Sequence, residues 1–280
     1  VLGESALDAS VSGGNNTAVG KEALTSLTSA VSCTAVGHIA GFSHTTGNNL
    51  TAIGRGAAYT STSGAENSGI GAGSLFYNTT GDSNTAVGRL ALTANTTADH
   101  NTAMGRSALA ANTTGNQNVA IGNYALDANT TASQLTAVGY NALSNNTTGA
   151  NNTALGRSAL LSNVTGNHNT AVGYNALLLS TGSSNTAIGT GALDAATSAN
   201  NNTAVGRNAL GLTTTGAENT AVGQASLDEN TTGTRNTGLG DQALSSNTTA
   251  SNNTAVGYQA LVTNTTGIQN VAVGANALDA

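Results

Sequence analysis

The side chains that most often perform chemistry in proteins are few in this chain and lie far apart. There are four histidines, His38, His44, His100 and His168, and one cysteine, Cys33. No Ser, His and Asp set recurs along the sequence, and no pair of acidic residues is spaced for general acid–base work. A single cysteine can form neither an intrachain disulfide nor a zinc cluster. We therefore expect no enzyme, no catalytic residue, no cofactor and no metal site.

Aspartates recur at one spacing that could in principle hold calcium, five residues after a regularly spaced glycine. Calcium-binding glycine-rich rolls carry such a residue in every repeat, whereas other repeats here lack it and have residues such as Thr, Ser or Ala at this position. We interpret these aspartates as solvated residues at an edge of the fold. They are Asp8, Asp127, Asp194, Asp228 and Asp279.

The residue directly after that glycine forms a column of long side chains, with six of the seven basic residues of the chain. Arg and Tyr in a row could contact glycans, an anionic surface or a neighbouring chain. Alternatively, the side chains cover the edge of a groove and pair with acids of a neighbouring repeat, which is the interpretation we favour. This candidate surface-contact column comprises Lys21, Arg55, Arg89, Arg106, Tyr140, Arg157, Tyr174, Arg207 and Tyr258.

The Asn-Thr-Thr segments create many Asn-x-Thr sequons, which are N-glycosylation acceptors in a suitable secretory host. Repetition of the motif alone generates them, so we predict a structural role in turns and amide ladders. Examples are Asn95, Asn112, Asn129, Asn146, Asn230 and Asn247.

Composition limits what can position these side chains. The 280 residues include no Pro, no Trp and two Phe, and only 7% are charged. Because large side chains normally fill a close-packed interior, any core must be thin. The net charge of −6 excludes a strongly basic nucleic-acid binder. No run of about 18 apolar residues exists, so we expect no membrane insertion by this segment.

The organising feature is a tandem repeat of 17 residues, with one step of 16 at Ser180-Thr181-Gly182. Numbered from its glycine, the consensus reads Asn (−4), Thr, Ala, Val, Gly (0), x, x, Ala (+3), Leu (+4), x, x, Asn (+7), Thr, Thr, Gly (+10), x, x. The glycine at position 0 indicates a corner that needs positive φ or allows no side chain. Representative corner glycines are Gly20, Gly37, Gly54, Gly88, Gly122, Gly156, Gly206 and Gly257.

A repeat this short cannot fold alone, and helical or leucine-rich repeats are longer. Thr-Ala-Val-Gly alternates with period two, which predicts a short strand. We expect a second strand through Thr-Thr, a core of Val and Leu columns, and stacked Asn ladders. The fold class predicted is an all-β parallel β-solenoid of about 17 coils. We expect one continuous domain over residues 1–280, cut from a longer fibre and without visible caps.

The motif Asn169-Thr170-Ala171-Val172-Gly173-Tyr174-Asn175-Ala176-Leu177 resembles the head repeats of YadA-like trimeric autotransporter adhesins. It is also similar to Asn-Thr-Ala-Val-Gly arrays of bacterial surface proteins and phage tail fibres. The resemblance covers the whole chain, although the repeat is longer than the usual head repeat and its strand motif is shorter. It implies a left-handed roll and a homotrimer.

The resulting expectation is a structural or adhesive segment of an extracellular fibre, on a cell surface or a virion. Its partners would be copies of itself, in a trimer or end to end, and a glycan or protein of the host surface. Two alternatives remain open, a self-assembling extracellular filament and an ice-binding protein. Ice faces usually show Thr-x-Thr on one flat strand, whereas the Thr-Thr residues here are adjacent and so point in opposite directions.

Overall fold

A computed structural model describes residues 2–279, which form short strands and turns and no helix. Within each of the two units described below, each strand pairs in parallel with the strand of the next repeat, so the predicted parallel β-solenoid is confirmed. Contacts divide the chain into two compact units, Val1–Tyr140 and Asn141–Ala280, which are described separately. Nowhere in residues 2–279 is there a helix long and apolar enough to cross a membrane.

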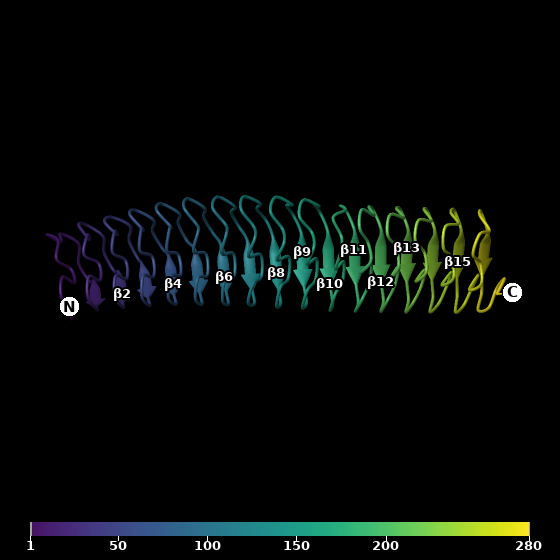
Figure 1. The fold of residues 1–280 in the computed structure, drawn as a ribbon, viewed down its shortest axis with the longest axis horizontal. Coiled ribbons are helices and arrows are strands. Elements are labelled where there is room, and N and C mark those ends of the chain that lie inside the picture. The colour runs from purple at the N-terminus through teal and green to yellow at the C-terminus, as the bar shows by residue number, and fades with distance from the viewer. Residues whose placement is uncertain (1, 280) are drawn as a thin grey trace. The chain divides into compact units, whose positions relative to one another are not determined.

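Within each unit, successive three-residue strands lie side by side and run in the same direction (Figure 1). The first unit contains β1 (Thr17–Val19), β2 (Thr34–Val36), β3 (Thr51–Ile53), β4 (Ser68–Ile70), β5 (Thr85–Val87), β6 (Thr102–Met104), β7 (Val119–Ile121) and β8 (Thr136–Val138). The second contains β9 (Thr153–Leu155), β10 (Thr170–Val172), β11 (Thr186–Ile188), β12 (Thr203–Val205), β13 (Thr220–Val222), β14 (Thr237–Leu239), β15 (Thr254–Val256) and β16 (Val271–Val273).

The strands pair in register, so equivalent residues of successive repeats stack. Thr85 of β5 lies beside Thr102 of β6, and the register continues through the 16-residue step, where Thr170 lies beside Thr186. In the shortened coil Ser180 is buried at position +7 and Thr181 occupies position +8, so the missing residue is the one at +9. That position is exposed in other coils, for example at Thr97, and its loss therefore removes nothing from the core.

The corner at position 0 requires glycine for two reasons, as Gly88 shows. Its φ is +132°, in a region that side-chain-bearing residues almost never adopt. A Cβ there would also lie 2.5 Å from the carbonyl oxygen of Gly105 in the next coil. The other corner glycines named above have φ between +128° and +138°. A side chain at this corner is thus incompatible with the stacking distance.

The core consists of small and aliphatic residues, but not of the ones expected from the strand sequence. Ala86 of β5 and Leu92 at position +4 are fully buried, whereas Val87 is only half-buried. At the same position Ile53 is 38% exposed and Leu155 46%. The expected core of Val and Leu columns is therefore wrong for Val. In a three-residue strand both ends point to one face, and the narrow interior accepts only the central alanine.

The expected second strand through Thr-Thr is also absent from the described residues, where these segments are bends. They still connect coils, because the hydroxyl and backbone N–H of Thr79 each donate to the carbonyl of Thr96 at 2.9 Å. Val164, one of the valines that replace Thr at position +8, is 39% exposed. Position +8 is therefore not a packed core position in this coil, although Thr and Val exchange there.

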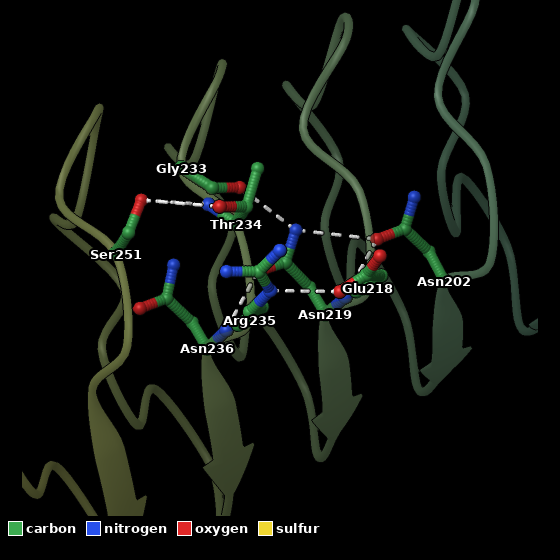
Figure 2. Close-up of polar contacts among 8 residues, drawn as sticks. All are labelled: Asn202, Glu218, Asn219, Gly233, Thr234, Arg235, Asn236 and Ser251. Carbon is green, nitrogen blue, oxygen red and sulfur yellow. Dashed lines mark hydrogen bonds and ion pairs between the residues drawn. The ribbon is translucent and has the colours of Figure 1, made fainter.

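Two buried columns of asparagine form the predicted amide ladders. At position −4, the Nδ2 of Asn219 donates to the carbonyl of Gly233 at 2.9 Å, and its Oδ1 accepts the backbone N–H of Asn236 at 2.9 Å (Figure 2). At position +7, the Nδ2 of Asn95 donates to the Oδ1 of Asn78 at 2.7 Å and to the carbonyl of Ala98 at 3.0 Å. These bonds satisfy amides that would be costly to bury alone.

The two ladders respond differently to interruption. Where leucine replaces asparagine at position −4, the backbone N–H of Leu135 still donates to the Oδ1 of Asn118 at 3.0 Å. At position +7 the link runs between side chains, and Ser180 is too short to continue it. The buried Oδ1 of Asn163 accordingly has no hydrogen-bond partner. The ladder at +7 therefore depends on an unbroken run of asparagine.

The side chains at positions −2 and +3 contact each other in the core, so the size of one limits the size of the other. Glycine replaces alanine at position −2 only at Gly69 and Gly238, and serine replaces alanine at position +3 only at Ser74 and Ser226. A Cβ at Gly238 would lie 2.5 Å from the Oγ of Ser226, and one at Gly69 would lie 3.1 Å from the Oγ of Ser74. The hydroxyl of Ser226 donates to the carbonyl of Gly238 at 3.0 Å. Each serine thus occupies the space that the glycine leaves.

We predict that Gly88→Ala lowers the free energy of unfolding by about 3 kcal/mol, because it combines a disallowed φ with overlap against Gly105. Gly191→Ala is the matched control. Its φ is +66°, and alanine is found at φ +50° at Ala225. A Cβ there would meet only the end of the exposed Asn208 side chain, at 2.7 Å, which can move, so the expected cost is about 1 kcal/mol. Urea unfolding followed by circular dichroism measures both. Equal losses would contradict the assigned role of the corner.

We also predict strong coupling between Ser226 and Gly238. Gly238→Ala alone should destabilise the fold by about 2 kcal/mol through overpacking, and Ser226→Ala alone by about 1 kcal/mol through the lost hydrogen bond. In the double variant, which has the consensus alanine pair, most of the loss should be recovered. A double-mutant cycle by chemical unfolding tests this, and additive losses would show that the two side chains do not share one space.

Candidate interaction surfaces

The first candidate surface, here called the strand face, is formed by the outward residues of each strand at positions −3 and −1. Its members are Thr, Ser or Val at −3 and Val, Ile, Leu or Met at −1, without a charged residue in either column. Met104 is 42% exposed and Ile188 41%. Contiguous exposed aliphatic surface of this kind is typical of a contact with another macromolecule. Because every strand has such residues at positions −3 and −1, the strand face runs the length of the sheet in each unit.

The second candidate surface is the column at position +1, here called the edge column, which follows the strand face across the glycine corner. All nine predicted surface-contact residues are exposed, namely Lys21, Arg55, Arg89, Arg106, Tyr140, Arg157, Tyr174, Arg207 and Tyr258. The chain geometry thus presents the cations and rings beside the aliphatic stripe.

Several members of the edge column interact with the adjacent coil. Lys21 forms an ion pair with Glu4 at 3.1 Å. The hydrogen bond with Glu4, then the charges of Glu4 and Glu22, raise the pKa of the Lys21 amine. The guanidinium of Arg106 lies 5.5 Å from the ring centre of Tyr124, and that of Arg157 lies 5.6 Å from the ring centre of Tyr174. Such cation–π contacts stabilise extended side chains along the edge.

The seventh basic residue lies outside the edge column and is paired with an acid. Arg235, at position +12, donates through Nε to the carboxylate of Glu218 in the preceding coil at 2.9 Å (Figure 2). Both side chains are more than half exposed, and exposed pairs of this kind contribute little to stability. This pair therefore marks a solvated edge.

His44 lies in a buried polar cluster of the first unit. The Nδ1 of His44 lies 3.0 Å from the hydroxyl of Ser61, and its Nε2 and the thiol of Cys33 both contact the carbonyl of Gly47. His44, Ser61 and Cys33 are all inaccessible to solvent. Burial lowers the pKa of His44 and raises the pKa of the Cys33 thiol. A serine–histidine contact sealed in this way reaches no substrate and acts in packing.

The remaining sequence candidates do not gather into one site. His38, His100 and His168 are exposed. Burial raises the pKa values of the half-buried carboxyl groups of Asp127, Asp194 and Asp228. Residues 2–279 bring no three His, Cys, Asp or Glu side chains together into a metal site. The sequon asparagines, which are Asn95, Asn112, Asn129, Asn146, Asn230 and Asn247, are all fully buried and cannot be glycosylated in the folded chain.

The strand face is the surface that sequence reasoning missed, because its aliphatic residues were assigned to the core. A signal was present in the variability of the two columns. From Ala18 to Ala272 position −2 holds only Ala or Gly, as a narrow interior demands, whereas position −1 exchanges Val, Ile, Leu and Met. Tolerance of shape at a hydrophobic position indicates a surface more than a close-packed core.

We predict that His44 makes the fold sensitive to acid. Because burial lowers its pKa in the folded state, the unfolded chain takes up a proton first as pH falls below about 6.5. Stability should be highest above that pH and should fall below it, by up to about 1.4 kcal/mol per pH unit from this one group.

The control is His44→Asn, which restores the consensus residue and can donate to Gly47 as Asn78 donates to Gly81 at 3.0 Å. Unfolding free energies measured from pH 8 to pH 5 should show a smaller decline for the variant. Parallel curves for the two proteins would refute a contribution from His44.

No model of a known protein family matches the chain, and no curated protein matches it.

Proposed function

We propose that the chain is a structural and adhesive segment of an extracellular fibre, and that copies of it associate through the strand face. The observation that carries this proposal is the uncharged aliphatic stripe at position −1, exposed between 36% and 46% at Val36, Met104, Leu155 and Leu239. Burial of apolar surface drives association at roughly 25 cal/mol per Å². A stripe repeated in every coil gives a long interface from small contributions.

The resemblance to YadA-like heads leads us to propose a homotrimer, with the strand faces packed together and the edge column at the margin. In such an arrangement the arginines and tyrosines of the edge column remain open to a glycan or protein of a target surface. The repeat also suits a segment that sets the length of a fibre. Each coil bonds only to its neighbours, so coils can be added without changing the interface.

An ice-binding role is the second candidate, and the outward strand residues favour it more than the sequence indicated. Thr85 and Val87 point to the same face, two residues apart, and equivalent pairs repeat in the next coil about 4.8 Å away. This gives one flat rank of Thr and one of aliphatic residues. A thermal-hysteresis measurement on concentrated protein separates the candidates, since the fibre proposal predicts no depression of the freezing point.

We predict that lysines on the strand face convert the oligomer into a monomer. The test variant is Ile53→Lys, Val87→Lys and Ile121→Lys together, at the outward end positions of β3, β5 and β7. Light scattering after size exclusion should give three times the mass of one chain for the original protein and the mass of one chain for the variant, with the same circular dichroism.

The matched control places three lysines on the edge column, at His38, Ala72 and Asn123, which are all exposed. It should remain trimeric, because these positions lie beside the interface and not in it. A monomeric original protein, or a strand-face variant that remains trimeric, would overturn the proposal. Electron microscopy of the same samples distinguishes discrete rods from the indefinite filaments that end-to-end stacking would give.

A further inference from the structure

The repeat departs from its consensus most strongly in one stretch of the first unit, and the departures lie together in space. Aromatic rings occupy position +5 in three successive coils, at Phe42, Tyr59 and Phe76. Their ring centres are 5.2 Å and 4.9 Å apart in a stacked arrangement. In two successive coils, glycine stands at position +2, as Gly56 and Gly73.

These glycines let neighbouring side chains approach the backbone closely, and a surface pocket lies beside them. A Cβ at Gly56 would lie 3.1 Å from the Cε2 of Phe76, and a Cβ at Gly73 would lie 2.9 Å from the Cδ2 of Leu90. The pocket has a volume of about 240 Å³. The side chains of Ile39, Phe76 and Leu90 line it with apolar surface.

Two arginines line the same pocket. Arg55 and Arg89 belong to the edge column and line the pocket with Ala72, the edge residue of the coil between them. Their Cα atoms are two coils, or about 10 Å, apart. Within residues 2–279 no ion pair of Arg55 or Arg89 with a carboxylate is formed, in contrast to Lys21 with Glu4. Between the two arginines, Ala72 has only a methyl side chain, which does not cover the mouth of the pocket.

We propose that this pocket binds a small carboxylate attached to a single aromatic ring. The ring would lie against Phe76, Ile39 and Leu90, since apolar walls with a few placed polar groups are typical of small-molecule sites. The carboxylate would accept hydrogen bonds from Arg55 and Arg89, because the planar guanidinium matches carboxylate geometry. This inference does not depend on self-association, since the edge column lies outside the proposed interface.

The edge column offers Ala72→Tyr as a substitution that should block the pocket. Tyrosine is native at position +1 in other coils, as at Tyr140, Tyr174 and Tyr258, so Ala72→Tyr should fold while filling the mouth of the pocket. Thr190→Tyr places the same side chain at the same position in the second unit, away from the pocket, and serves as its control.

The experiment is a saturation-transfer NMR titration of the full chain with phenylacetate. We expect saturable binding with a dissociation constant of about 1 mM, as for a ligand of this size. Arg55→Gln and Arg89→Gln should each weaken it about ten-fold, and Ala72→Tyr should abolish it. Thr190→Tyr and Arg106→Gln should bind as the original protein does, and 2-phenylethanol, which lacks the charge, should bind about ten-fold more weakly.

Several results would overturn the inference. Absence of saturable phenylacetate binding would show that the pocket does not bind this class of ligand. Equal binding of 2-phenylethanol would show that the carboxylate is not recognised. Unchanged binding by Ala72→Tyr would place the ligand elsewhere, and a loss in only one of the arginine variants would contradict a carboxylate held between the two. Equal losses in Thr190→Tyr and Ala72→Tyr would show that the ligand has no defined pocket.

Discussion

The structure depends on the constant distance between stacked coils. Parallel strands lie about 4.8 Å apart, so equivalent residues of successive coils stack within each unit. This spacing excludes a side chain at Gly88, whose Cβ would overlap the carbonyl of Gly105. It also places the amide of Asn95 within 2.7 Å of the amide of Asn78. Glycine corners and asparagine ladders are thus two consequences of one spacing.

The same constraint determines what lies inside and outside. A coil closed by one three-residue strand encloses little volume, and alanine, leucine and asparagine fill it. The larger strand residues then face outward and form the strand face. The edge column lies beside it. Function in such an array arises where one column keeps its chemistry over many coils, or where neighbouring coils depart from it together, as at Gly56 and Gly73.

Much of the fold could be predicted from the sequence, because a strict period translates directly into stacked columns. The strand at Thr-Ala-Val and the amide ladders followed from it. The inward and outward faces did not, since alternation alone does not tell which face is buried. Nor did the left-handed backbone of Leu92, at φ +49°. That conformation costs about 1–2 kcal/mol, which burial of a whole leucine side chain offsets at 1.5–3 kcal/mol. The pocket beside Arg55 and Arg89 also requires coordinates, because it depends on which coils adjoin.

The most direct test of this account measures the rise per repeat in solution. Spin labels placed in pairs on the edge column of the first unit, in a Cys33→Asn background, report distances by pulsed electron paramagnetic resonance. Pairs joining Tyr140 to Arg55 and to Lys21 span five and seven coils, so the backbone separations should be about 24 Å and 34 Å. Excess unlabelled chain suppresses distances between subunits. Narrow distributions that lengthen by about 4.8 Å per coil are predicted, and distances that do not grow with the number of repeats would contradict the stacked solenoid.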